Sequence, residues 1–174
     1  MTAVQIRDAV SRDADDIASI HVRSWRAAYR GLIDQEVLDA MSIADRTEGW
    51  RRIIAEPLPS TLGLLVAARD AAVVGWTSFG SGRDDDGAGD GEVYGIYADP
   101  DAWSTGVGHA LLAAAESRMT DAGHSRAYLW VLDGNDRADI FYQRHGWVID
   151  GATRVEQRPG LTLPEHRRVK LLPR

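Results

Sequence analysis

The sequence predicts an α/β protein in which helices flank the faces of one mixed β-sheet. Short apolar runs of strand length alternate along the chain with longer segments whose apolar residues recur every three or four positions. Gly, Asp and Ser gather between many of these segments, as is typical of turns. The expected order is one strand, several helices, three strands, a helix, a strand, a helix and two strands. This order indicates a mixed sheet with helices on its faces.

The N-terminal third is expected to form a short strand at 4–7 followed by helices. A helix over 11–29 is predicted because one of its faces collects apolar and aromatic side chains and its first turn is acidic. Ser11 is a candidate cap for this helix. Asp34 is a candidate cap for a second, short helix, and a third helix is expected over about 45–55.

The rest of the chain is expected to alternate strands and helices. Strands at 62–68 and 73–79 form a hairpin, and the Gly- and Asp-rich stretch 80–91 that follows is predicted to be a mobile, solvated loop. Its central triplet, Asp84 to Asp86, lacks the spaced ligands of a calcium loop, so no metal site is predicted. The remaining expected elements are the strand 92–98, a helix up to about 122, the strand 126–132, the helix 136–145 and the strands 147–150 and 165–172.

Composition indicates one ordinary globular domain over residues 1–174, because apolar residues make up 44% of the chain. The chain has no cysteine, which excludes disulfides, thiolate metal sites and a cysteine-bound acyl intermediate. No apolar run reaches the length of a membrane span, and the first residues lack the layout of a signal peptide. A cytoplasmic protein without membrane contact is therefore expected. The net charge of −6 disfavours nucleic acid as a partner.

The turn between the strand 92–98 and the following helix is rich in small residues. The N–H groups that begin a helix lack intrahelical partners and carry partial positive charge, so they can bind a phosphate. Gly106 and Gly108 allow the chain to bend and a ligand to approach, and Ser104 and Thr105 are candidate caps. Neither a dinucleotide fingerprint nor a P-loop is present, so the turn alone fits either a phosphate site or a plain helix start.

Two separate motifs resemble those of the GCN5-related N-acetyltransferases. Trp103 to Gly108, which reads Trp-x-x-Gly-x-Gly after a strand, is similar to the acetyl-CoA loop of that family. The strand 129–132, Asn135 and the segment Phe141 to Trp147 are similar to its second CoA segment. The resemblance covers nearly the whole chain and is strongest from Glu92 to Trp147. It implies the family's fold, a central, mostly antiparallel sheet flanked by helices, and acetyl-CoA as co-substrate without a metal.

The resemblance also implies which residues hold acetyl-CoA. In the family the strand before the loop bulges and separates from its neighbour, and the pantetheine arm binds the main chain in the opening. Trp103 stands where the family usually has Gln or Arg, and Thr105 stands where Arg or Lys is frequent. Pyrophosphate binding would therefore depend mainly on backbone N–H groups. Arg137 and Arg144 are candidates for additional positive charge, as is His109. The implied cofactor-binding residues are Ile96, Tyr97, Ala98, Ser104, Thr105, Gly106, Val107, Gly108, His109 and Asn135.

Acyl transfer from a thioester to an amine requires a base, a polarised carbonyl and an acid. Glu92 lies where the histone-modifying branch of the family carries its catalytic glutamate, which implies a base that acts directly or through water. Alternatively, Glu92 is only a polar residue that opens a strand. Tyr142 matches the family's tyrosine beside the CoA sulfur and is expected to protonate the thiolate. Its alternative role is a packed aromatic ring whose hydroxyl bonds to the backbone.

The acceptor site is the least readable part of the sequence. The segment 24–31 resembles one near the acceptor entrance of bacterial small-molecule members, with Tyr29 and Arg30 as candidate contacts and Trp25 expected in the core. The predicted function is direct transfer of acetyl from acetyl-CoA to a primary amine of a small molecule, peptide or protein N-terminus in a ternary complex. The alternatives are an acyl-CoA-binding regulatory domain with reduced turnover and a nucleotide-binding α/β domain. The resemblance also allows a homodimer.

Overall fold

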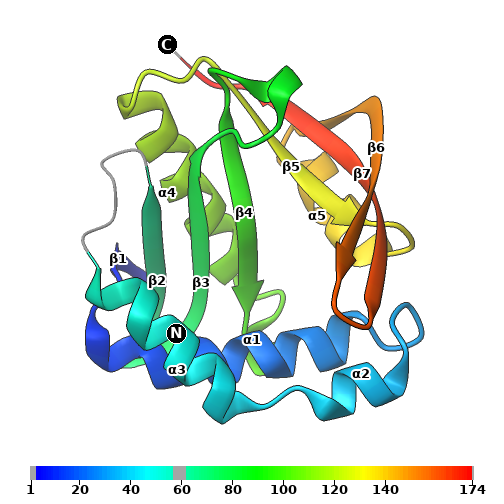
Figure 1. Cartoon of the computed structure of the whole chain (residues 1–174). Helices are drawn as coiled ribbons and strands as arrows, with labels where there is room; N and C mark the ends of the chain where they lie inside the picture. The colour runs from blue at the N-terminus through cyan, green and yellow to red at the C-terminus, as the bar shows by residue number, and fades with distance from the viewer. Residues whose placement is uncertain (1–2, 57–61, 174) are drawn as a thin grey trace.

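The computed structural model describes residues 3–56 and 62–173 and contains one seven-stranded sheet with strand order β1-β2-β3-β4-β5-β7-β6 (Figure 1). Neighbouring strands are antiparallel except for β4 and β5. The predicted mixed, mostly antiparallel sheet is thus confirmed. The strands are β1 (Gln5–Asp8), β2 (Gly63–Arg69), β3 (Ala72–Ser81), β4 (Gly91–Ala98), β5 (Arg126–Leu132), β6 (Val148–Arg158) and β7 (Leu161–Leu171). The α-helices are α1 (Ala14–Ala28), α2 (Gln35–Ala40), α3 (Ile43–Ala55), α4 (Val107–Asp121) and α5 (Asp136–Arg144).

Helices cover both faces of the sheet because alternate residues of its strands point in opposite directions. In β2, Leu64 and Val66 pack in one apolar cluster with Ile17 of α1. Leu65 and Ala67 belong to a second cluster, which contains residues of both α4 and α5. Figure 1 shows α1 and α3 in front of the sheet and α4 behind it. Among the described residues, none of the helices combines the length and apolar character that crossing a bilayer requires.

The expected helix caps are confirmed only in part. The Asp34 carboxylate accepts a hydrogen bond from the N–H of Glu36 at 3.0 Å and begins α2 as predicted. Ser11 does not cap α1, because residues 11–13 form a separate 3-10 turn before it. The carboxylate that binds the backbone of this turn is that of Asp13, which accepts a hydrogen bond from the N–H of Val10 at 2.8 Å.

The two C-terminal strands are much longer than the sequence predicted. β6 and β7 form one hairpin over residues 148–171, whereas only 147–150 and 165–172 were expected as strands. The apolar alternation of β6 is weak because Arg154 and Glu156, which share one face, line a cavity. The apolar Val155 between them points outward and is 57% exposed. The hydrophobic pattern is therefore inverted along this strand.

The stretch 80–91 is more constrained than expected. Its acidic side chains are bound by residues of neighbouring strands, since Trp130 Nε1 donates to Asp84 at 2.8 Å and Arg167 pairs with Asp86 at 2.8 Å. The loop is solvated as predicted, since the Asp86 side chain is 63% exposed, but these contacts tie it to the neighbouring strands. Arg83, in the same stretch, is held against the start of β4.

The central feature of the sheet is the separation of β4 from β5. These parallel strands pair only at Gly91–Ala127 and Glu92–Tyr128. The opposite edge of β4 remains paired with β3 as far as Ala98, with a bulge beside Tyr94. A bulge bends and twists a strand. It therefore turns the remainder of β4 away from β5 and leaves one edge of β4 open, as the resemblance implied.

A buried histidine lies between α1 and the sheet. His21 is 8% exposed, and neither of its ring nitrogens has a hydrogen-bond partner among the described residues. Burial, together with the positive charges of Arg46 and Arg158, lowers the pKa of His21 to about 3. Four aromatic rings surround it within 6.2 Å, those of Trp25, Trp50, Trp76 and Tyr97.

We expect His21 to destabilise the fold in acid. Below pH 6.5 the unfolded chain binds a proton that the folded chain excludes until about pH 3, so stability is lost as the pH falls through this window. Between pH 7 and pH 5 the wild type should lose about 2 kcal/mol more unfolding free energy than His21→Leu. Denaturant unfolding at both pH values measures this. His124→Gln, outside the cluster, should behave as wild type, and an equal loss in His21→Leu would contradict the prediction.

Candidate active site

A cavity of about 880 Å³ occupies the opening between β4 and β5. It extends from the loop before α4, past α5, to the β6–β7 hairpin. Most of the predicted site residues line it, but Val107 lies in the core, Thr105 does not reach the cavity and Arg30 is exposed elsewhere. The residues that line it as predicted are Tyr29, Glu92, Ile96, Tyr97, Ala98, Ser104, Gly106, Gly108, His109, Asn135 and Tyr142.

The loop before α4 offers several unpaired backbone donors at one end of the cavity. The N–H groups of residues 104–109 find no acceptor among the described residues, and Val107 begins the helix. Gly106 adopts φ +88°, which favours glycine, and nothing occupies the space a Cβ would take. Neither Ser104 nor Thr105 caps the helix, since the N-cap is Gly106 and Thr105 Oγ1 donates to the carbonyl of Ala102 at 2.7 Å.

The second glycine of the turn has a packing role. A Cβ at Gly108 would lie 3.3 Å from the Phe141 ring, so this glycine allows α4 and α5 to approach closely. The two sequence motifs therefore touch in the structure. His109 Nδ1 and His145 Nε2 are 2.9 Å apart at the same junction.

Trp103 replaces a polar residue of the family motif and organises the mouth of the cavity. Its Nε1 donates to the Ala98 carbonyl at 3.0 Å, and the Arg137 guanidinium stacks 3.9 Å from its ring centroid. Such stacking stabilises a cation over an indole. Arg137, the second residue of α5, thus places a positive charge beside position 103. Since the Ala98 carbonyl also accepts from Ser24 at 3.1 Å, it is already paired within the protein.

Asn135 and Tyr142 lie on the α5 side of the cavity. Asn135 Oδ1 accepts from the N–H of Ala138 at 3.2 Å and caps α5, while its amide nitrogen has no partner among the described residues. The Tyr142 hydroxyl likewise has no partner among the described residues, so it is not bound to the backbone. Burial, with a smaller contribution from Tyr97, raises the pKa of Tyr142 well above its usual value. The phenol is therefore a neutral donor at physiological pH.

Glu92 is buried where β4 and β5 are still paired. Arg83 Nη2 donates to its Oε1 at 2.6 Å, and Arg83 Nε and Tyr128 Oη donate to its Oε2 at 2.9 and 3.0 Å. The N–H of Arg83 adds a further bond to Oε2 at 3.1 Å. Burial, aided by the Glu92 charge, raises the pKa of Tyr128 to about 12, so this phenol stays a donor. The carboxylate is therefore surrounded by donors from its own protein.

The comparison with known protein families agrees with this geometry. The model described as "Acetyltransferase (GNAT) family" matches residues 17–147. The chain belongs to this family.

Individual GNAT relatives extend the comparison. The chain is 33% identical over 143 residues to the uncharacterized N-acetyltransferase YuaI of Bacillus subtilis, covering 82% of this chain and 79% of YuaI. It is 37% identical over 105 residues to mycothiol acetyltransferase of Propionibacterium freudenreichii, covering 59% of this chain but only 33% of that protein. The structure of a PaiA N-acetyltransferase from Thermoplasma acidophilum in complex with coenzyme A superposes with a TM-score of 0.72 at 20% identity. That match covers 97% of this chain and 99% of the other.

This GNAT protein is an acetyl-CoA-dependent N-acetyltransferase. The features that fit the co-substrate are the free N–H groups before α4, the Arg137 guanidinium on Trp103 and the open edge of β4. A helix start binds a pyrophosphate, and an unpaired strand edge binds an amide-rich arm. All of them border one cavity.

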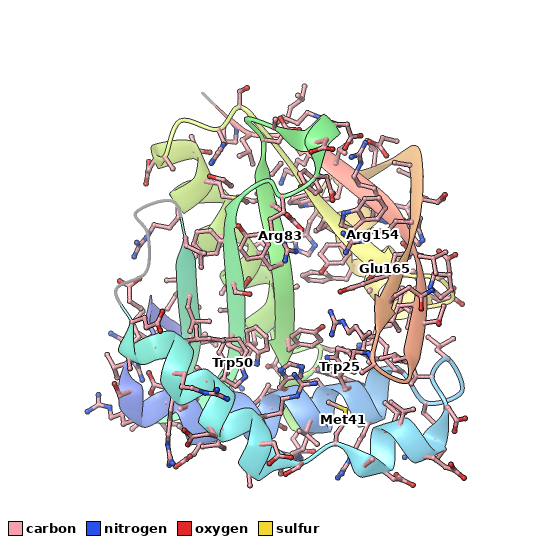
Figure 2. All side chains as sticks on the ribbon, viewed as in Figure 1. Trp25, Met41, Trp50, Arg83, Arg154 and Glu165 are labelled. Atoms are coloured by element: carbon pink, nitrogen blue, oxygen red, sulfur yellow. The ribbon has the colours of Figure 1, made fainter. Side chains whose placement is uncertain are left out.

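The end of the cavity away from the GNAT loop is strongly charged. Figure 2 shows Arg83 on one side of this space and Arg154 and Glu165 on the hairpin side. Tyr29 and Tyr97 line the same cavity, and their hydroxyl oxygens lie 3.4 Å apart. Trp25 is 5% exposed and packs in the core as expected.

Sequence reasoning missed these charged residues. Arg83, Arg154, Glu156, Arg158 and Glu165 all line the cavity but belong to no recognised motif. The available signal was the alternation of Arg154, Glu156 and Arg158, which places three charges on one face of a strand. Charged residues at every second position, where apolar residues usually recur, would also have extended the predicted strand.

We expect Gly106→Ala to weaken acetyl-CoA binding. An alanine at φ +88° costs about 1 kcal/mol and distorts the turn that directs the N–H groups. Gly89→Ala is a matched control, because Gly89 has φ +93° and open space but does not line the cavity. Both variants should lose similar thermal stability, whereas only Gly106→Ala should raise the acetyl-CoA dissociation constant in calorimetry. Equal affinity in the two variants would contradict the role of the turn.

Proposed function

We propose that this chain transfers acetyl from acetyl-CoA directly to a primary amine while both substrates occupy the same cavity. The observation that carries the proposal is the continuity of that cavity. It runs from the backbone donors before α4, past the Tyr142 hydroxyl, to the charged side chains of the β6–β7 hairpin. A direct transfer needs both substrates to meet at one point, and a single continuous space allows this.

When bound, acetyl-CoA supplies an acetyl carbon that is open to attack by a nucleophile. We assign the N–H groups of residues 104–109 to its pyrophosphate and the main chain of Ile96 and Tyr97 to its pantetheine arm. The free amide nitrogen of Asn135 faces the same arm. These donors are backbone or amide groups, so they hold the co-substrate at any pH at which the protein is folded.

Tyr142 is assigned to protonate the sulfur as the thioester bond breaks. Its support is a hydroxyl with no partner among the described residues, in the cavity wall between the CoA loop and the acceptor end. Burial keeps the phenol protonated, which a proton donor requires. Two carboxylates remain candidates for removing the acceptor's proton, Glu92 from the sequence and Glu165 from the structure.

A small molecule or a flexible peptide N-terminus is the proposed acceptor. Side chains from α1, β4, β5, β6 and β7 enclose the charged end of the cavity together. The name of the matched mycothiol acetyltransferases supports a small-molecule acceptor, although that match spans only a third of the relative.

The deciding experiment combines acetyl-CoA binding with turnover. Calorimetry should detect acetyl-CoA binding to the wild type, and thiol release should reveal acetylation in a panel of monoamines, polyamines, amino acids and peptides with free N-termini. Binding without acetylation of any amine would favour the regulatory acyl-CoA-binding domain. No binding up to millimolar concentration would contradict both proposals.

Tyr142→Phe tests the proton donor. We expect the kcat for the best amine of the panel to fall by about 100-fold, because general acid catalysis contributes about 10²–10⁴-fold. Acetyl-CoA affinity should stay within about threefold of wild type, since the ring is retained and the hydroxyl has no internal partner. Unchanged kcat would exclude Tyr142 as the acid.

A further inference from the structure

Three carboxylates line the cavity: those of Glu92, Glu156 and Glu165. An acceptor amine arrives mostly as ammonium at neutral pH, because an alkylammonium has a pKa near that of lysine, about 10. It must lose a proton before its nitrogen can attack. The group that takes this proton needs an oxygen that faces the cavity and is not already occupied by donors of the protein.

Glu92 does not meet this requirement well. Its side chain is 2% exposed, and its two oxygens receive four hydrogen bonds from Arg83 and Tyr128. An ammonium that approached Glu92 would have to displace a bidentate guanidinium, which is among the stronger carboxylate contacts in proteins. The carboxylate instead joins the loop 82–90 to the start of β4.

Glu156 is more open, and its charge is held by arginines. Arg158 Nε donates to Glu156 Oε1 at 3.0 Å, and Arg154 Nη2 lies 3.7 Å from Oε2. Its side chain is 30% exposed, so water screens it more than it screens Glu165.

Glu165 has the arrangement that a proton acceptor needs. Its Oε2 accepts from Arg154 Nε at 2.7 Å, while its Oε1 has no donor among the described residues. Arg154 is itself fixed, since its guanidinium stacks 4.4 Å from the Trp130 ring centroid. One oxygen is thus held in place and the other is left for a ligand. The side chain is only 11% exposed.

The position of Glu165 in the cavity also suits a proton acceptor. It pairs with Leu132 of β5, at the end of that strand farthest from the residues that pair with β4. Its charge contributes, after burial and other groups, to raising the pKa values of Tyr29 and Tyr97, whose hydroxyls lie 3.4 Å apart. Tyr97 in turn contributes to raising the pKa of Tyr142. Glu165 therefore lies within electrostatic range of Tyr29 and Tyr97, which line the same cavity as Tyr142.

We propose that Glu165 is the catalytic carboxylate that binds the acceptor's ammonium group and takes its proton. This inference rests on the proposed amine acetylation. One proton passes from the ammonium nitrogen to Oε1 of Glu165, and the freed lone pair forms the bond to the acetyl carbon as the carbon–sulfur bond breaks. The sulfur takes a proton from Tyr142, the phenolate regains one from the nitrogen, and Glu165 releases its own to water.

The environment of Glu165 suits this cycle. Burial raises its pKa, Glu156 raises it further, and Arg154 and Arg158 oppose the rise. A base whose pKa is closer to neutrality accepts a proton more readily than an ordinary carboxylate does. The titratable and charged groups around it are Arg154, Glu156 and Arg158 of β6, Tyr29 at the end of α1 and Tyr97 of β4, with Asp84 3.7 Å from Arg154 Nη1.

Glu165→Gln is the primary test, with the fastest amine of the panel as substrate. We expect kcat/KM at pH 7 to fall about 100-fold while acetyl-CoA affinity stays within threefold. In the wild type, kcat/KM should rise through the pKa of Glu165 and then level off. Without the carboxylate only free amine reacts, so the rate of Glu165→Gln should climb about tenfold per pH unit up to the ammonium pKa. A purely structural role would not change the shape of this profile.

Three further variants separate the outcomes. Glu156→Gln removes the same charge from the same wall and should keep the shape of the wild-type pH profile. Glu165→Asp should keep a pH profile that levels off, at a reduced rate, even if Glu165→Gln fails to fold. A rate for Glu165→Gln within threefold of wild type overturns the inference, and a 100-fold loss in Glu92→Gln beside it would identify Glu92 as the base. A wild type that binds acetyl-CoA but acetylates no amine contradicts the proposed function and the inference with it.

Discussion

The separation of β4 from β5 is the constraint on which the rest of the structure depends. Two parallel strands that stayed paired would bury the edge of β4 and leave no cavity between them. Here the pairing stops after Glu92–Tyr128, and the bulge beside Tyr94 turns β4 away. A buried carboxylate requires paired donors, so Arg83 and Tyr128 are drawn to Glu92 at the point of divergence. The network fixes where the sheet opens.

The cavity that results has two chemically different ends. Next to α4 the donors are backbone N–H groups, with Arg137 stacked on Trp103 as the added cation. Next to the β6–β7 hairpin the wall consists of alternating arginines and glutamates. The first end suits one fixed anionic co-substrate, and the second suits a smaller ligand that is recognised by its charge pattern. The aromatic cluster around His21 adjoins the cavity through Tyr97, whose ring stacks on His21 and which lines the cavity.

The sequence pointed to more of the cavity-lining residues near α4 and α5 than of those on the β6–β7 hairpin. The turn at Gly106 and the segment from Asn135 to Tyr142 could be read because they combine fixed spacing with backbone chemistry, and the cavity lies between them. Residues such as Glu165 could not be read, because their role depends on which strand lies opposite. Arg154 and Glu165 are partners only through the register of β6 and β7. Register is set by long-range packing, and a charged inner face removes the apolar alternation that would reveal it.

The inverted pattern of β6 has a consequence for how this protein can change over evolutionary time. Of its inward residues, Glu156 and Arg158 are 30% and 42% exposed and contribute to none of the three apolar clusters that hold the fold together. Replacing them changes what the cavity wall presents without removing buried hydrophobic contacts, so such substitutions carry little folding penalty. The loop at Gly106 has no such freedom, because φ +88° restricts its residue type. One molecule thus combines a turn that tolerates few residue types with a wall on which new acceptor preferences can arise by single substitutions.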